Sequence, residues 1–207
     1  MAENEKPQRV EITNRKRLLD AFFKVDEVTV SHEQFNGEMS KTRPYLVFER
    51  GDAVAALLCD PGRRKVITVN QFRIPTLEKG QGGGWLIEAV AGMIDEPADD
   101  TPRETPIECL RREVLEETGY QITGAEPIFT FFSSPGGSSE RIYLFYVEVR
   151  QTDKVSEGGG LKAGGEDIEI VEFDTGDFFA KLRGGEFEDP KLIIAGQWLM
   201  AKHAQRG

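Results

Sequence analysis

Three glutamates crowd the segment RREVLEETGY, residues 111–120. Glu113, Glu116 and Glu117 lie within five consecutive positions, and on a helix they share one side, where each pair of like charges costs roughly 0.2–0.5 kcal/mol. The middle and last turns that they occupy also disfavour negative charge, because of the helix dipole. A solvated acidic face is the alternative interpretation. Clustered carboxylate oxygens are, however, the ligands that hard divalent cations prefer, so the pattern favours a metal site.

The helix that carries these glutamates has clear end signals. Thr105 is a suitable N-cap, Pro106 suits the first helical position, and Glu108 completes a capping box. Gly119 is expected to end the helix. An apolar stripe runs beside the glutamates and consists of Ile107, Leu110 and Val114. The acidic side of the helix therefore borders the expected core.

Strand patterns precede and follow this helix. Alternating apolar residues from about Leu18 to Glu49, interrupted by the turn Asn36-Gly37, predict a hairpin-rich N-terminal sheet. Other strands are expected in the apolar or aromatic segments 53–60, 65–72, 85–92, 126–132, 142–149 and 168–173. Helices are expected at 175–185 and 189–203, and the glycine-rich segment 156–165 is expected to be flexible. These patterns predict a mixed α/β layered domain and not a doubly wound one.

The composition excludes several classes of protein. The chain has 207 residues, a formal net charge of −10 and 39% hydrophobic residues, as expected for one main globular domain with an appendage. Nucleic acid is not expected as a partner, because it is normally bound by a basic surface. Cys59 and Cys109 are too few for a disulfide framework, and neither a signal peptide nor a membrane-spanning apolar run is apparent. We therefore expect a cytoplasmic protein that does not bind membranes.

Other residues near the strand at 85–92 could take part in a site. Glu88 interrupts an apolar segment, and a buried carboxylate requires a partner or a metal ion. Arg73, in NQFRIP, could bind a phosphate group, although a structural role at a strand end is equally compatible with its position. Four aromatic residues are expected in the core rather than stacked on a nucleobase, namely Trp85, Phe131, Phe132 and Trp198.

The acidic helix resembles the second half of the Nudix box, GX5EX7REUXEEXGU, in which U is aliphatic or aromatic. Glu104 is followed by seven residues and then by REVLEETGY, residues 112–120. The first glycine of the box is best assigned to Gly92, but eleven residues separate it from Glu104 where the family has five. The chain therefore carries a six-residue insertion within EPADDTPR, residues 96–103. We expect this insertion to form a surface bulge that leaves strand and helix in place, because lengthening a loop costs little entropy.

The resemblance extends to one subfamily, the ADP-ribose and GDP-mannose pyrophosphatases. The segments that carry it are VNQFRIPT, IEAVAG, SPGGSSE and GGEDIEI, and Pro135 lies sixteen residues beyond Gly119, as in the ADP-ribose-type members. It implies a Nudix fold with a mixed β-sheet sandwiched between helices, residues 50–207, and a small N-terminal antiparallel sheet domain, residues 1–49. It also implies a homodimer across which the N-terminal domain is exchanged.

The resemblance further implies roles for individual residues. Glu113 and Glu117 are the first expected ligands of two or three Mg²⁺ or Mn²⁺ ions, followed by Glu116 and the carbonyl of Ala91. Arg112 is expected to hold Glu104 or a neighbouring acid by a bidentate contact. The general base stays open between Glu166, Glu116 and a metal-bound hydroxide. Residues expected near the substrate are Arg73, Glu88, Pro135 and Gly136.

The activity implied is hydrolysis of the pyrophosphate bond of a nucleoside diphosphate sugar. ADP-ribose would give AMP and ribose 5-phosphate, and GDP-mannose would give GMP and mannose 1-phosphate. The sequence alone does not separate these substrates, and a dinucleotide or another nucleoside diphosphate derivative is a further alternative. A catalytically silent nucleotide sensor would be favoured by loss of Glu113, Glu116 or Glu117, and all three are present.

Overall fold

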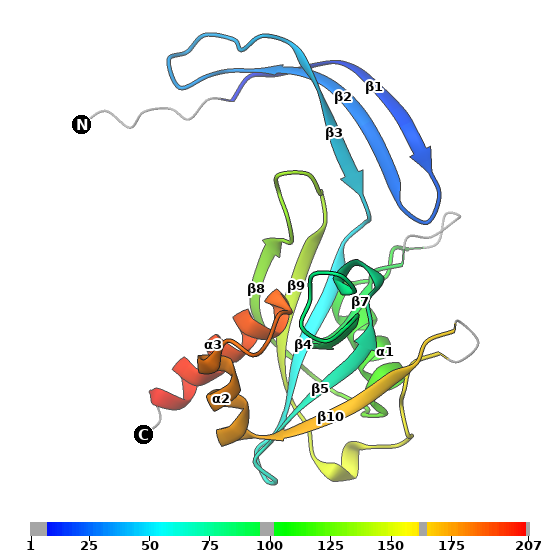
Figure 1. Cartoon of the computed structure of the whole chain (residues 1–207), viewed down its shortest axis with the longest axis vertical. Coiled ribbons are helices and arrows are strands. Elements are labelled where there is room, and N and C mark those ends of the chain that lie inside the picture. The colour runs from blue at the N-terminus through cyan, green and yellow to red at the C-terminus, as the bar shows by residue number, and fades with distance from the viewer. Residues whose placement is uncertain (1–7, 96–101, 162–164, 206–207) are drawn as a thin grey trace. The chain divides into compact units, whose positions relative to one another are not determined.

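The computed structural model describes residues 8–95, 102–161 and 165–205. The chain divides into two compact units, one formed by Met1–Gly51 with Phe132–Arg141 and the other by Asp52–Phe131 with Ile142–Gly207 (Figure 1). The strands are β1 Val10–Asp20, β2 Lys24–His32, β3 Arg43–Glu49, β4 Ala53–Asp60, β5 Lys65–Phe72, β6 Trp85–Glu88, β7 Val90–Met93, β8 Glu126–Phe132, β9 Arg141–Glu148 and β10 Ile168–Asp174. The α-helices are α1 Pro106–Thr118, α2 Thr175–Gly184 and α3 Pro190–Ala204, and the short 3₁₀ segments are η1 Ile74–Thr76 and η2 Gln151–Asp153.

The smaller unit is built on an antiparallel sheet in the order β1-β2-β3. Strand β1 starts at Val10, earlier than the expected Leu18. The sequence pattern does not predict this start, because the residues of β1 are exposed along the whole strand and give no alternating apolar signal. The loop between β8 and β9 also belongs to this unit. Its Gly137 carbonyl accepts the Phe48 N–H at 2.8 Å, and the Phe48 carbonyl accepts the Ser139 N–H at 3.2 Å.

The larger unit contains a mixed sheet with the order β10-β5-β4-β9-β8, to which β6 adds beside β5 and β7 beside β4. Strands β4 and β9 run parallel, and the other neighbouring pairs with a described register run antiparallel. Helix α1 covers one face of the sheet, and helices α2 and α3 cover the other (Figure 1). The expected layered fold, with a mixed sheet between helices and a separate small antiparallel sheet, is confirmed.

Strand β4 shows why the sheet needs helices on both faces. All eight of its residues are buried. Ala53, Ala55 and Leu57 pack in the core against α2 and α3, as their period of two requires. Val54, Ala56 and Leu58 point to the opposite face and pack in the core that contains Cys109, Leu110 and Val114 of α1. A continuous apolar strand is the signature of such a sheet.

The expected single strand at 85–92 is two strands that change partner at Ala89. Strand β6 pairs with β5, whereas β7 pairs with β4. The Ala89 N–H lies between them and donates to Oδ2 of Asp189 at 3.0 Å. Because the apolar pattern runs through the break, the sequence does not reveal it. The change of partner places Glu88 on β6 and Ala91 on β7, the strand that packs against α1.

Two of the expected core aromatics are largely exposed. Trp85 is 44% exposed and packs edge-to-face on the exposed Phe72, with ring centroids 5.8 Å apart. Phe132 is 52% exposed, because β8 is the terminal strand of its sheet. Phe131 and Trp198 do pack against the core. Both cysteines are free and buried, and within the described ranges no helix is long and apolar enough to span a membrane.

Candidate active site

Helix α1 forms where the sequence predicts it. Oγ1 of Thr105 accepts the Glu108 N–H at 3.4 Å, and Oε2 of Glu108 accepts the Thr105 N–H at 2.9 Å, which completes the capping box. Gly119 ends the helix in the left-handed conformation, with φ of 77°, and its N–H donates to the Leu115 carbonyl. The apolar stripe is buried against β4 and β7. This packing fixes the direction in which the acidic side of α1 points.

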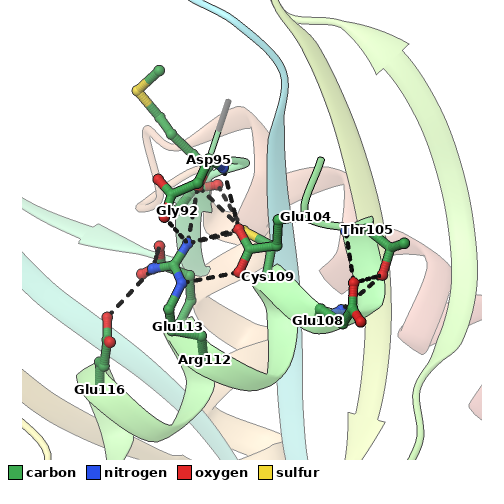
Figure 2. A network of polar contacts seen from close by, with 10 residues as sticks. Gly92, Asp95, Glu104, Thr105, Glu108, Cys109, Arg112, Glu113 and Glu116 are labelled. Carbon is green, nitrogen blue, oxygen red and sulfur yellow. Dashed lines mark hydrogen bonds and ion pairs between the residues drawn. The ribbon is translucent and has the colours of Figure 1, made fainter. Parts of the chain in front are cut away.

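Arg112 is the centre of an ion-pair network on α1 (Figure 2). Its Nε and Nη2 donate to Oε1 and Oε2 of Glu104, both at 3.0 Å, and the expected bidentate contact is thereby confirmed. Its Nη1 donates to Glu113 at 2.7 Å and to Glu116 at 3.4 Å. The guanidinium lowers the pKa of Glu104, and Glu104 in turn raises the pKa of Arg112. Both groups therefore stay charged at neutral pH.

The described ends of the six-residue insertion lie close together. The Asp95 N–H donates to Oε2 of Glu104 at 3.2 Å. The Met93 carbonyl accepts from Nη2 of Arg112 at 3.1 Å and lies 3.3 Å from Sγ of Cys109. Residues 96–101, where most of the insertion falls, lie outside the described residues. Strand β7 and helix α1 are therefore joined directly at the base of the insertion, and Glu104 keeps its contact with Arg112.

Glu117 is a buried carboxylate and Glu113 a partly buried one. Burial raises the pKa of Glu113, although Arg112 opposes the shift. Burial raises the pKa of Glu117 well above its ordinary value, and the negative charge of Glu113 adds to the shift. Oε2 of Glu117 accepts the Ala91 N–H at 3.3 Å. Two desolvated and mutually repelling acids of this kind are typical of functional sites.

Gly92, the first glycine of the motif, makes room for Glu113. A Cβ atom at position 92 would lie 1.8 Å from Cδ and Oε1 of Glu113, a distance that no packed structure tolerates. Any side chain at this position would displace the carboxylate. The glycine is therefore required by the site and not by a turn, because only a bare backbone allows the strand to approach α1 so closely.

A second group of charges borders Glu117 from the sheet. Nε of Arg73 donates to Oε2 of Glu88 at 2.7 Å, and the charges of both residues affect the pKa of Glu117. Nζ of Lys191 lies 3.3 Å from Oε1 of Glu88 and 2.7 Å from Oδ1 of Asp189. The expected partner of the buried Glu88 is therefore a pair of cations. Lys191 and Asp189 were not predicted, because they lie about a hundred residues from Glu88 along the chain.

Glu166 approaches the site from the segment that precedes β10. Its carboxylate accepts the Leu161 N–H at 2.7 Å, and its charge contributes to raising the pKa of Glu113. The part of the glycine-rich segment before it is anchored to the end of α1. Gly159 and Gly160 donate their N–H groups to the carbonyls of Glu117 and Glu116 at 2.9 and 3.0 Å. The expectation of a flexible segment did not foresee these bonds, which depend on residues about 40 positions away.

The predicted site residues fall into two groups. Those that the structure brings together in the larger unit are Arg73, Glu88, Ala91, Arg112, Glu113, Glu116 and Glu117, with Glu166 within electrostatic reach. Pro135 and Gly136 lie in the loop of the smaller unit. Their contact with substrate stays a prediction.

The chemistry of the donors fits a divalent metal ion. Glu113, Glu116 and Glu117 offer hard carboxylate oxygens, and among the described residues the buried Glu117 side chain accepts a hydrogen bond from the Ala91 N–H alone. In the part of the chain that the structure describes, no three or more His, Cys, Asp or Glu side chains form a ready metal-binding cluster. Nη1 of Arg112 donates to one carboxylate oxygen of Glu113 and to one of Glu116. Those oxygens would have to turn from Arg112 to hold a cation.

Fold and site together define a layered α/β protein whose central helix presents buried carboxylates beside a β-strand.

Residues 49–191 match the family model described as the NUDIX domain. Over 193 residues the chain is 34% identical to the GDP-mannose pyrophosphatase of Cronobacter sakazakii, covering 93% of this chain and 96% of that protein. It is 32% identical over 196 residues to the GDP-mannose pyrophosphatase of Salmonella typhimurium, covering 95% and 97%. The chain belongs to the Nudix family. Nudix pyrophosphatases generally use divalent metal ions.

Proposed function

We propose that the protein hydrolyses the pyrophosphate bond of a nucleoside diphosphate sugar and that GDP-mannose is its preferred substrate. The observation that carries this proposal is the pair of acids formed by the partly buried Glu113 and the buried Glu117, held beside Gly92 and the ion-paired Arg112. The choice of GDP-mannose is supported by relatives of that name, which the chain matches over nearly its whole length. ADP-ribose is the comparison substrate, since the sequence resembles both groups of enzymes.

The metal is proposed to be Mg²⁺, or Mn²⁺ in its place, with two or three ions per site. Glu113 and Glu117 would hold it first, followed by Glu116 and the carbonyl of Ala91. When bound, the ions supply positive charge that neutralises the pyrophosphate oxygens and acidifies the attacking water. Arg112 keeps Glu104 in position and is a counter-charge for the acids of α1. The positive charges of the bound ions and of Arg112 would reduce the electrostatic repulsion between a polyanionic substrate and a chain of net charge −10.

Arg73 and Glu88 are proposed to orient the substrate. The side chain of Arg73 is 37% exposed while its Nε pairs with the buried Glu88, so other donors of Arg73 are left to bind a phosphate oxygen. Glu166 is proposed to accept the proton of the attacking water, and Glu116 is the alternative. Water then adds to phosphorus, the bridging P–O bond breaks, and the products are GMP and mannose 1-phosphate.

The assembly is proposed to be a cytoplasmic homodimer in which the N-terminal sheet domain, residues 1–49, is exchanged. Pro135 and Gly136 are proposed to contact the substrate from the loop of that unit. Support for the exchange comes from the exposure of large apolar residues along the N-terminal sheet, such as Val10, Ile12 and Leu46, which an isolated monomer would leave in water. Sedimentation of the full chain tests the dimer directly.

The function is tested by incubating the purified chain with GDP-mannose or ADP-ribose, with Mg²⁺ or with EDTA. We expect release of GMP from GDP-mannose that requires the metal and exceeds AMP release from ADP-ribose. The reverse preference would assign ADP-ribose as substrate. Tight binding of both nucleotides without any release of GMP or AMP would contradict an enzymatic role.

A further inference from the structure

The glycines of the segment SEGGG form a turn that has no side chains between Glu166 and helix α1. Gly158, Gly159 and Gly160 have φ values of 71°, 96° and 77°, the left-handed region that side-chain-bearing residues rarely adopt. Three such residues in succession are costly to order unless the structure requires that conformation. These glycines lie between the end of α1 and the candidate base Glu166, and contacts on both sides require this conformation.

The turn packs backbone against backbone at the end of α1. A Cβ atom at Gly158 would lie 2.6 Å from the Thr118 carbonyl carbon and 2.7 Å from the Glu117 carbonyl oxygen. The N–H groups of Gly159 and Gly160 donate to the last-turn carbonyls of Glu117 and Glu116, which otherwise lack partners within the helix. The turn is thereby fixed to the same helical turn that carries two of the site carboxylates.

The outer side of the same turn holds Glu166. The Leu161 N–H donates to Oε2 of Glu166 at 2.7 Å, and the Glu166 N–H returns to the Leu161 carbonyl at 3.4 Å. A Cβ atom at Gly160 would lie 2.8 Å from Oε2 and 2.9 Å from Cβ of Glu166. The space beside Gly160 is therefore filled by the Glu166 side chain and by Cδ1 of Ile168, which would lie 2.9 Å from the added Cβ. At Gly159, by contrast, an added Cβ would meet only the Ile168 carbonyl oxygen, at 3.5 Å.

We infer that Gly160 and Leu161 are positioning residues. Gly160 leaves space for the Glu166 side chain, the Leu161 N–H binds its carboxylate, and together they fix the position of this carboxylate relative to the acids of α1. Because the turn is bonded to the carbonyls of Glu116 and Glu117, Glu166 is aligned with the helix and not merely tethered to a loop. The inference rests on the proposed function for its catalytic consequence. The contact between Leu161 and Glu166 is independent of that function.

The kinetic test compares two alanine substitutions in one turn. Gly160→Ala and Gly159→Ala both place alanine at a left-handed position, but only Gly160→Ala displaces Glu166. We expect Gly160→Ala to lower kcat for the nucleotide sugar by at least about tenfold with KM within about twofold, because small misplacements of a reacting group are costly. Gly159→Ala is expected to lower kcat by less than about threefold. Equal losses in kcat for the two variants would overturn the inference.

A double substitution separates positioning from general damage. In the Glu166→Gln background, Gly160→Ala is expected to lower kcat by less than about twofold, since residues that act as a unit are not additive. If Gly160→Ala lowers kcat by the same factor in both backgrounds, Gly160 does not act through Glu166. Melting temperatures of Gly160→Ala and Gly159→Ala, expected to fall by similar amounts, show that both variants fold.

Amide hydrogen exchange tests the contact without substrate or metal. In the wild-type chain the Leu161 amide is expected to be protected, and Gly160→Ala or Glu166→Ala should speed its exchange at least about tenfold. The amide of residue 159, bonded to α1, should keep its protection in Glu166→Ala. Unchanged Leu161 exchange in both variants would overturn the inference. If the wild type releases no nucleotide from any substrate, the proposed function fails while the exchange result still decides the contact.

Discussion

The two units of the chain place the same acidic side chain in opposite environments. In the small sheet, Glu33 accepts hydrogen bonds from the Arg9 side chain and from the backbone N–H groups of Gln8 and Arg9, and these bonds lower its pKa to about 2. In the larger unit, burial raises the pKa of both Glu113 and Glu117. One unit stabilises its carboxylate charge, and the other unit makes charge costly where a metal ion and a phosphate would bind.

Asp26 shows that burial alone does not produce the difference. It is only 2% exposed, yet its pKa is lowered, chiefly by its hydrogen bond with Arg17. A nearby guanidinium therefore offsets desolvation in the small sheet. Within the described residues no guanidinium donates to Glu117, and Arg112 donates to Glu104, Glu113 and Glu116. Glu117 is thus an acid whose burial is not offset by a hydrogen-bonded guanidinium, at the position where we propose that a metal ion binds.

Replacing the buried acid that lacks a cation has the largest expected effect. We expect Glu117→Gln to lower kcat by about 100-fold or more, because removal of one group that stabilises the transition state costs that much. The same change should raise the melting temperature, since it removes a desolvated carboxylate and its repulsion with Glu113. Nucleotide release and differential scanning calorimetry measure the two outcomes. A variant that is less stable and fully active would contradict the contrast between the units.

An intermediate effect is expected from Arg112→Lys. A lysine keeps the charge but loses the bidentate contact with Glu104, and loss of such supporting contacts costs about 10–100-fold in metal affinity or activity. The matched control is Arg111→Lys. Arg111 is exposed, and among the described residues its side chain donates to the Thr123 carbonyl and to no carboxylate, so its replacement should leave Mn²⁺ affinity, measured by electron paramagnetic resonance, within about twofold. Equal affinities for the two variants would show that the Arg112 network does not support the metal site.

The smallest effect is expected in the N-terminal sheet. Glu33→Gln should lower the melting temperature at pH 7 by less than about 2 °C, because exposed ion pairs contribute little, and should leave kcat unchanged. Since the pKa of Glu33 is lowered from 4.5 to about 2, its contribution is present above pH 4.5 and declines as the pH falls toward 2. Melting curves between pH 7 and pH 3 measure this decline.

The pKa shift of Glu117 is opposite in direction to that of Glu33, so its ionised form is expected to lower stability. Its raised pKa means that the folded chain binds this proton more tightly than the unfolded chain, so the protonated form contributes stability at low pH that is lost as the pH rises through the raised pKa. The gain in melting temperature for Glu117→Gln should therefore be largest near neutral pH and shrink on acidification. The same pH dependence for Glu33→Gln and Glu117→Gln would remove the distinction between the two environments.

The parts that the sequence predicts are those with local causes. The capping box of α1 lies within four residues, Thr105 to Glu108, and the structure reproduces it. The contact between Glu104 and Arg112 follows from a motif of fixed spacing. The strand pattern likewise predicts β4, β5, β9 and β10 from their own residues, because apolar side chains select their environment without reference to distant partners.

What the sequence does not predict depends on distant partners. The cations that pair with Glu88 come from residues 73 and 191, and no spacing rule connects all three. At the change of strand partner, the Ala89 N–H donates to a carboxylate of residue 189. The order in the glycine-rich turn depends on carbonyls of α1. In each case the local sequence looks apolar or flexible, and its structure is determined by hydrogen bonds to residues far away in the chain.

The hydrogen bond between Asp95 and Glu104 has a practical consequence for protein engineering. Because it joins the segment after β7 to the segment before α1 at the base of the insertion, the residues between these two positions are not needed to bring Glu104 to Arg112. Homologous chains can therefore differ in length at this point without moving the acids of α1. The same junction is a suitable place to graft an epitope, a fluorescent label or a tether to a surface, since added length in a closed loop costs little entropy.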